Sequence, residues 1–140
     1  MKPKTIKIFE KVSFPDLGVA EAMAKIDTGA WGGALHATDI TEITLSTGEQ
    51  AVSFKPLGQG PKITVSDFKQ LVVRSSNGHV SKRYAIPTII TIRSVQYLTR
   101  ISLVDRSTMK WPVLVGRSFL REHGFLVDAQ MHNEYGDGGK

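Results

Sequence analysis

The segment Ala24–Ala30, with the sequence AKIDTGA, contains the side chain that is best placed to do chemistry. Asp27 follows a short apolar run and precedes Thr28 and Gly29, so we expect it where a buried strand ends in a turn. An ionised carboxylate buried there is costly unless it is hydrogen-bonded, paired or protonated. The Thr28 hydroxyl and nearby peptide N–H groups could support it for proton transfer. An ordinary strand-ending turn also explains these three residues.

A second segment, residues 113–120 (VLVGRSFL), is an apolar strand that ends in Gly116 and Arg117 and continues into a short helical pattern. Asp-Thr-Gly-Ala followed later by such a Gly-Arg segment resembles the two signatures of the retropepsins, the aspartic peptidases of retroviral type. Residues 71–79, 82–86 and 104–109 further resemble a bacterial retropepsin-like family often labelled ATP-dependent zinc protease, whose genes commonly accompany ATP-grasp ligases. The resemblance covers about residues 17–128.

The resemblance implies an aspartic endopeptidase in which two carboxylates share one proton. One carboxyl group takes a proton from water while the other protonates the carbonyl oxygen of the peptide bond. The sequence has no second Asp-Thr-Gly or Asp-Ser-Gly. An active enzyme must therefore be a symmetric homodimer in which each chain contributes its Asp27.

The resemblance also assigns roles to the residues around this carboxylate. Asp27, Thr28 and Gly29 would be catalytic, with Thr28 hydrogen-bonding across the dimer. Asn77 and Gly78 would form the tip of a flap that closes over the substrate. Substrate-binding residues would be Ala30, Trp31, Asn77 and Gly78, and Gly116 and Arg117 would give structural support, with Gly116 allowing its strand to pass beside the Asp27 loop.

One position departs from the retropepsin pattern and leaves Arg117 without its usual partner. Retroviral enzymes usually have an acid soon after Asp-Thr-Gly-Ala that receives the arginine of the Gly-Arg motif, whereas Trp31 follows here. Arg117 therefore needs another partner, and Asp105 and Asp128 are both candidates. Trp31 could either form a wall of the substrate pocket or cap the barrel.

The residue pattern does not favour the zinc chemistry of the family label. Catalytic zinc commonly takes three protein ligands, often from a His-Glu-x-x-His helix. The four histidines are widely separated, and Glu122-His123 lacks a second histidine one turn away. His36 and Asp39, near Asp27, keep the metal alternative open. We expect no metal and no cofactor.

The basic charge is concentrated in the middle of the chain. Residues 69–110 carry eight Lys/Arg and only Asp105 as an acid, which accounts for the whole net charge of +5. This field could attract acidic peptides, including glutamate-rich tails of the kind that ATP-grasp ligases make, or it could simply be a solvated sheet face. Nucleic acid is a weaker partner because exposed aromatic residues for stacking are sparse there.

Length and composition suit one compact domain. We expect a single retropepsin-like domain over residues 1–135 and a disordered tail over 136–140. The sequence has no cysteine, no apolar run that could cross a membrane and no hydrophobic signal segment. These features predict a cytoplasmic protein without a disulfide framework.

Period-two apolar patterns predict an all-β protein. In residues 19–26 we expect Ala20, Ala22, Ala24 and Ile26 on one face, and Asn77-Gly78 predicts a two-residue type I′ turn. Residues 117–123 form the one helical pattern, stopped by Gly124. Further strands are expected over 5–14, 35–37, 43–45, 51–54, 63–65, 88–92, 97–104 and 125–127. Many short strands imply a small closed barrel of retropepsin type with one short C-terminal helix.

Two functions of different class fit these observations. One is an aspartic endopeptidase that is active as a homodimer and cuts peptides, with acidic ones as candidates. The alternative is a catalytically silent or latent retropepsin-like module that binds peptides or regulates a partner, with a functional link to an ATP-grasp ligase.

Overall fold

The fold is built almost entirely from short strands. The computed structural model describes residues 4–74 and 76–130. Its elements are β1 (Lys4–Ile6), β2 (Phe9–Phe14), the 3₁₀ turn η1 (Pro15–Leu17), β3 (Val19–Ile26), β4 (Gly33–Thr44), β5 (Gln50–Pro56), β6 (Ile63–Val65), β7 (Lys69–Arg74), β8 (Val80–Ile92), β9 (Val95–Val104), β10 (Val113–Val115), α1 (Arg117–Glu122) and β11 (Phe125–Val127).

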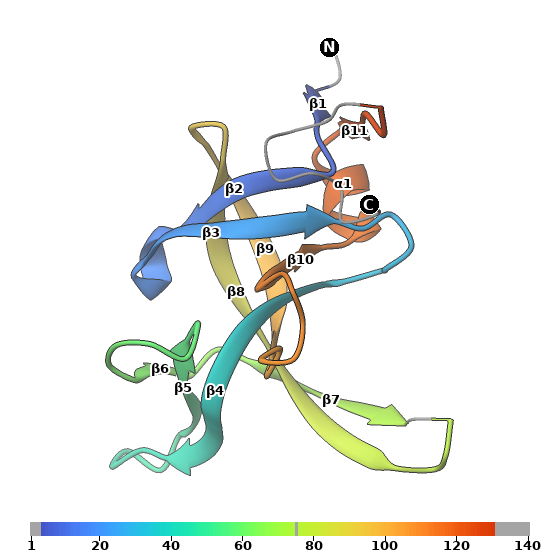
Figure 1. The fold of residues 1–140 in the computed structure, drawn as a ribbon. Helices are drawn as coiled ribbons and strands as arrows, with labels where there is room; N and C mark the ends of the chain where they lie inside the picture. Colours follow the sequence, from blue (N-terminus) through green and yellow to red (C-terminus); the bar gives the residue numbers. More distant parts are fainter. Residues whose placement is uncertain (1–3, 75, 131–140) are drawn as a thin grey trace.

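Six strands of the described chain close into a barrel (Figure 1). They follow the hydrogen-bonded order β10-β3-β2-β8-β9-β4, and β4 pairs in turn with β10. β5 and β6 continue the sheet from β4, while β1 and β11 form a separate parallel pair. The predicted all-β closed barrel with one short helix is confirmed.

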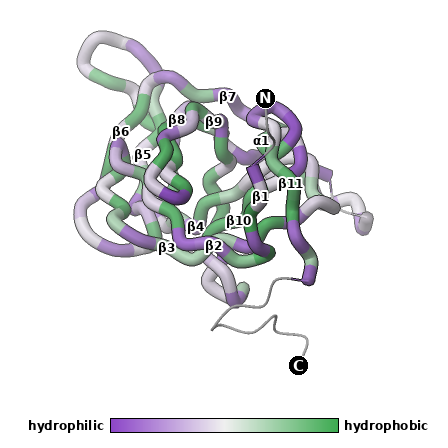
Figure 2. The backbone as a smooth tube through the Cα atoms, turned by 90° about the horizontal axis from the view of Figure 1, so that it is seen from above, coloured by the Kyte–Doolittle hydropathy of each residue, from purple (hydrophilic) through white to green (hydrophobic). Residues whose placement is uncertain are grey.

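The barrel interior is filled by the apolar face of each strand. Figure 2 shows apolar and hydrophilic stretches alternating along the tube, as the period of a strand requires. In β3 the predicted residues Ala22, Ala24 and Ile26 are buried. Ala20 is exposed, contrary to prediction, and Val19 is buried instead. The reason is a register shift between Val12 and Phe14 of β2, which displaces this end of the β2–β3 pair.

The predicted division of the chain into strands was wrong in two places. The strand expected over residues 5–14 is broken into β1 and β2, and the Lys7 N–H between them donates to Glu10 Oε2 at 2.8 Å. The strands expected over 35–37 and 43–45 are one continuous strand, β4. Asp39 adopts a left-handed φ of 54° within β4, and the β4–β5 register shifts between Thr38 and Thr41. A bulge that bends one strand therefore looks like two strands in the sequence.

The type I′ geometry predicted for Asn77-Gly78 occurs elsewhere. Arg93 and Ser94 have φ angles of 51° and 68° and directly connect the paired residues Ile92 and Val95. A hairpin does form around residue 77, but its last register pair is Arg74 with Val80. The connection between Arg74 and Val80 is thus longer than the predicted two-residue turn.

β7 and residues 80–85 of β8 form a two-stranded hairpin arm that extends away from the barrel (Figure 1). Near the barrel, Gln70 Nε2 and the Tyr84 hydroxyl both donate to Glu42 Oε1, at 3.2 and 3.1 Å. Farther out, the arm exposes the apolar side chains of Leu71, Val72 and Val80. The arm is thus fastened at its base and exposes these three apolar side chains farther out.

The helix α1 begins directly after Gly116 and ends at Glu122, and Gly124 has a left-handed φ of 73°, as its predicted role at the helix end requires. No helix in the described residues is both long enough and apolar enough to cross a membrane. The predicted tail, residues 136–140, lies outside the described residues. The single domain over residues 1–135 stays a prediction.

Candidate active site

Asp27 directly follows the last residue of β3 and begins the loop that leads to β4. Its N–H donates to the carbonyl oxygen of Val115 at 2.8 Å, which continues the parallel pairing of β3 with β10. The side chain is half-buried, and its Oδ1 accepts the Gly29 N–H at 2.9 Å. The carboxylate is thus oriented by a peptide N–H of its own loop.

The loop after Asp27 is bound to the start of α1. The N–H groups of Arg117 and Ser118 donate to the carbonyl oxygens of Ala30 and Trp31, at 2.8 and 3.0 Å. The first N–H groups of a helix have no partner within the helix. Here they use two carbonyl groups of the Asp27 loop, so the helix and the loop are fixed relative to each other.

Gly116 lies at the closest approach of the two segments. A Cβ atom at Gly116 would lie 2.5 Å from the Gly32 carbonyl oxygen and 2.6 Å from that of Trp31. Both neighbours are backbone atoms, and real Cβ atoms essentially never come so close. The strand β10 can therefore pass this loop only with glycine at position 116.

Arg117 does not use either carboxylate that the sequence suggested. Its Nη1 donates to the carbonyl oxygens of Thr28 and Gly29, at 3.3 and 3.2 Å. Asp105 instead accepts from Ser107, and Asp128 from the Gln130 N–H. The prediction of Asp105 or Asp128 as partner was wrong because backbone carbonyl groups, which no residue pattern reveals, take the place of an acid.

Trp31 does not cap the barrel. Its side chain is 60% exposed, and the Arg117 guanidinium lies over its ring, 5.4 Å from the centroid. Arg117 thus supports the loop twice, through hydrogen bonds and through a cation–π contact. This exposure excludes the cap, and the alternative role of Trp31 as a wall of the substrate pocket stays a prediction.

The structure brings the Asp27 loop together with residues 116–118, but it leaves the other proposed substrate-binding residues apart from them. Asn77 and Gly78 lie in the connection at the tip of the hairpin arm, where the Asn77 Oδ1 accepts the His79 N–H at 3.3 Å. The arm tip is directed away from the barrel (Figure 1). Asp27 and the arm therefore do not form a closed site in a single chain.

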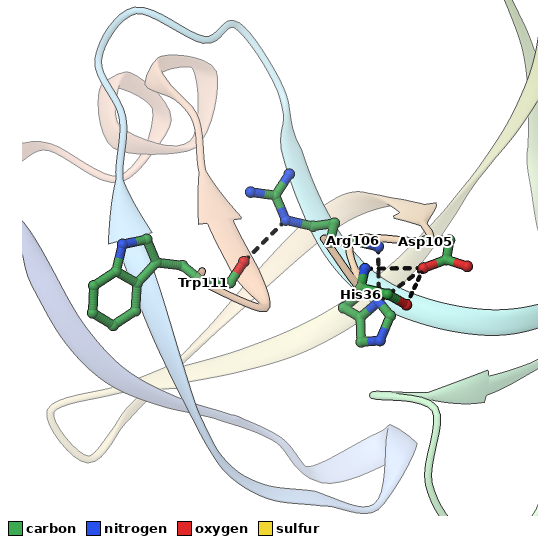
Figure 3. A network of polar contacts seen from close by, with 5 residues as sticks. His36, Asp105, Arg106 and Trp111 are labelled. Atoms are coloured by element: carbon green, nitrogen blue, oxygen red, sulfur yellow. Dashed lines mark hydrogen bonds and ion pairs between the residues drawn. The ribbon is translucent and has the colours of Figure 1, made fainter. Parts of the chain in front are cut away.

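A polar network that the sequence did not reveal connects β4 to the segment after β9 (Figure 3). His36 Nδ1 accepts the Arg106 N–H at 2.8 Å and thus acts as an acceptor in this network. The Asp105 Oδ1 lies 3.8 Å from the same nitrogen and makes no hydrogen bond with it in this state. The Arg106 Nε donates to the Trp111 carbonyl oxygen at 3.0 Å.

The pKa values of two groups in this network, Asp105 and Arg106, are lowered from their ordinary values. The pKa of Asp105 lies below its usual value, first because the Ser107 hydroxyl and then the Ser107 N–H donate to the carboxylate. The pKa of Arg106 is also lowered, first by desolvation and then by the positive charge of Arg83. From the sequence, His36 was considered only as a metal ligand and Asp105 only as a partner of Arg117.

The described residues do not fit the zinc site that the family label implies. Among them, no three His, Cys, Asp or Glu side chains gather where they could hold a metal ion. His36 is engaged with the Arg106 N–H, and His123 Nε2 lies 3.1 Å from the Leu98 carbonyl oxygen. His132 lies outside the described residues.

A closed all-β barrel with an Asp-Thr-Gly loop braced by Gly-Arg defines a retropepsin-like protein. The match of residues 5–134 to the RimB-like family, described as retropepsin-like aspartic endopeptidase RimB, shows that the chain belongs to this family. The predicted family is thereby confirmed.

Curated relatives carry a ligase name. Two proteins named "Probable alpha-L-glutamate ligase", from Shewanella halifaxensis and Shewanella pealeana, are each 32% identical over 125 residues, which is 85% of this chain. A protein of the same name from Desulfotalea psychrophila is 26% identical over 140 residues. The chain spans 27% of the length of each Shewanella relative. These names agree with the predicted association of the family with ligases.

A solved structure shares the fold. A Legionella pneumophila protein of unknown function (DUF785) superposes with a TM-score of 0.73 at 23% identity, covering 93% of this chain and 96% of that one. At this identity the likeness concerns the fold alone.

Proposed function

We propose that this protein is an aspartic endopeptidase whose active form is a homodimer with one Asp27 from each chain. The observation that carries the proposal is the geometry of the Asp27 loop. A half-buried carboxylate is oriented by the Gly29 N–H, and the loop that holds it is braced by Gly116 and Arg117. A turn that only ended a strand would not need this bracing from a distant segment.

The chemistry requires two such carboxyl groups. At close range two carboxylates do not both ionise, so the pair holds one proton and titrates as a unit. The ionised member removes a proton from water, and the protonated member donates to the carbonyl oxygen of the peptide bond. The sequence has a single Asp-Thr-Gly. A second copy of the chain supplies the other carboxyl group across a two-fold axis, with Thr28 hydrogen-bonding between the two loops.

In this proposal the hairpin arm is the flap. Its outer part exposes apolar side chains that a bound peptide would cover, and its tip contains Asn77 and Gly78. Ala30 and the exposed Trp31, with its ring against Arg117, would form one wall of the substrate site. Closure of the arm over this wall would exclude water from the reacting bond.

Acidic peptides are the substrate class that the charge distribution supports. Lys69, Arg74, Lys82 and Arg83 belong to the two strands of the arm, and all four are exposed. Glutamate-rich peptides are a specific candidate because curated relatives are named glutamate ligases. A positively charged flap would raise the local concentration of such a substrate.

The test is to replace Asp27 by Asn and to assay cleavage of a glutamate-rich peptide. We expect kcat/KM to fall by about 10²- to 10⁴-fold, because the amide cannot take up or release the proton. Asp39→Asn is the matched control: Asp39 is exposed, and Asn tolerates its left-handed φ of 54°. Equal turnover by the Asp27→Asn variant and the wild-type protein would contradict the proposal.

A second function is favoured by the relatives. The matched segment makes up only 27% of proteins that are named as ligases, so it could serve there as a peptide-binding module without cutting. The same experiment separates the two functions. A wild-type chain that binds the peptide without turnover, and an Asp27→Asn variant that binds it equally well, would support the binding module.

A further inference from the structure

The strand register places two arginines near each other where the hairpin arm leaves the barrel. In the β8–β9 pair, Tyr84 is opposite Leu103. Arg83 directly precedes Tyr84 on β8, toward the tip of the arm. Arg106 lies three residues after Leu103, just beyond the end of β9. The two side chains thus come from the arm and from the segment between β9 and β10, which leads to the Gly116-Arg117 brace of the Asp27 loop.

Arg106 is held in place from two sides. Its N–H donates to His36 Nδ1 at 2.8 Å, and its Nε donates to the Trp111 carbonyl oxygen at 3.0 Å. The Trp111 ring packs on Phe9, with 4.6 Å between the centroids. These bonds leave the two Nη groups of Arg106 available, and no ion pair joins them to an acid in the described part of the chain.

The nearest acid in the chain does not neutralise this arginine. Figure 3 shows the Asp105 carboxylate and the Arg106 guanidinium pointing in opposite directions, and Asp105 is engaged by Ser107. The guanidinium is partly desolvated and is repelled by the charge of Arg83, and both effects lower its pKa. Two arginines that repel each other with no acid between them are poised to take up an anion.

We propose that Arg83 and Arg106 together bind a carboxylate side chain of the substrate at the base of the hairpin arm. The proposal rests on the proposed peptidase function, which it deepens by naming the residues that recognise an acidic substrate. The planar guanidinium matches a carboxylate in a two-pronged arrangement. One carboxylate placed between the two arginines replaces their repulsion by two attractions. An acidic substrate would therefore be held at the base of the arm, next to the Tyr84–Leu103 pair, whereas a neutral one would leave the repulsion in place.

The experiment measures peptide binding and cleavage separately. A fluorescent peptide of glutamates and a matched peptide of glutamines are titrated into the Asp27→Asn protein, so that bound peptide is not cut. Arg83→Gln and Arg106→Gln should each weaken binding of the glutamate peptide by about tenfold or more. The glutamine peptide should be little affected. The double variant should lose much less than the sum of the two single effects, because the arginines hold one group.

Controls separate recognition from folding and from general charge. Arg121→Gln removes an exposed arginine of α1 and should change glutamate-peptide binding less than twofold. Arg83 is exposed on the arm, so its variant tests the proposal even where loss of the Arg106–Trp111 bond disturbs the loop. Arg106→Lys keeps the charge without the two-pronged donor and should restore only part of the affinity.

Several results would overturn the proposal. They are equal losses for both peptides, a loss no greater than that of Arg121→Gln, fully additive single effects, or no preference for glutamate over glutamine. Binding of a single-stranded oligonucleotide that exceeds peptide binding and falls in the same two variants would assign the pair to phosphates instead. Absence of cleavage by the wild-type protein, with the arginine coupling intact, would contradict the peptidase function alone.

Discussion

At the scale of single residues, Gly116 shows how strictly the Asp27 loop is built. Gly116→Ala would place a methyl group within 2.5 to 2.7 Å of the backbone of Trp31 and Gly32. Because backbone atoms must shift, we expect the free energy of unfolding to fall by about 1–3 kcal/mol and peptide cleavage to fall with it. Urea unfolding and a cleavage assay measure the two effects.

Gly32→Ala is the matched control for that change. Gly32 lies on the other side of the same contact, but a Cβ built there has no neighbour within 4 Å, and its φ is not in the left-handed region. Its stability should stay within about 0.5 kcal/mol of the wild-type value. Equal losses in the two variants would show that the close approach at Gly116 is not the cause.

Asp105 provides a pH-dependent prediction. Its pKa is lowered mainly by the Ser107 hydroxyl, so Ser107→Ala should raise the pKa toward the ordinary value. A depressed pKa stabilises the fold above the unfolded-state pKa, and this contribution is lost as the pH falls through the folded-state pKa. The stability difference between the two proteins should therefore disappear as the pH falls through the lowered pKa of Asp105. NMR titration of the Asp105 carboxyl carbon measures the pKa, and an unchanged value in Ser107→Ala would contradict the account. The control is Ser66→Ala, which removes an exposed serine hydroxyl directly after β6.

At the scale of elements, the turns show where residue patterns mislead. Asn77-Gly78 has the residue types of a type I′ turn, yet the geometry occurs at Arg93-Ser94, whose residue types do not predict it. The position of this turn is fixed by the pairing of β8 with β9. It is also fixed by an ion pair, because Arg93 Nη2 lies 2.8 Å from Oε2 of Glu10, whose side chain is only 8% exposed. A long-range ion pair thus outweighs the local preference.

This interpretation predicts that Ser94→Gly stabilises the protein. A left-handed conformation is unfavourable for serine and not for glycine, so we expect a gain of about 0.5–1 kcal/mol. Thermal unfolding measures the change. Ser102→Gly, within β9, should instead destabilise the protein by a similar amount. A loss of stability in Ser94→Gly would refute the turn geometry.

At the scale of the whole molecule, the sequence predicts the barrel and the family because both depend on local signals. The alternating pattern of the strands, like the Asp-Thr-Gly and Gly-Arg segments, consists of residues that are close together in the sequence. The sequence does not predict the partner of Arg117, because that arginine binds backbone carbonyl groups of a distant loop. It does not predict the relation between Arg83 and Arg106 either, because these residues are more than 20 positions apart and belong to different segments of the fold. The bend in β4 was missed for a similar reason, since a bulge is defined by its partner strand.

The central claim is that each chain carries one carboxyl group of a shared dyad, and a mixing experiment tests it most directly. Wild-type protein is equilibrated with an equal amount of the Asp27→Asn variant, and cleavage is assayed per mole of wild-type chain. If the dyad spans two freely exchanging chains, only a quarter of the dimers are fully wild type and activity should fall to about half; Asp39→Asn, mixed in the same way, should cause no loss. Unchanged activity at every ratio of the inactive chain would show that one chain suffices and would contradict the account.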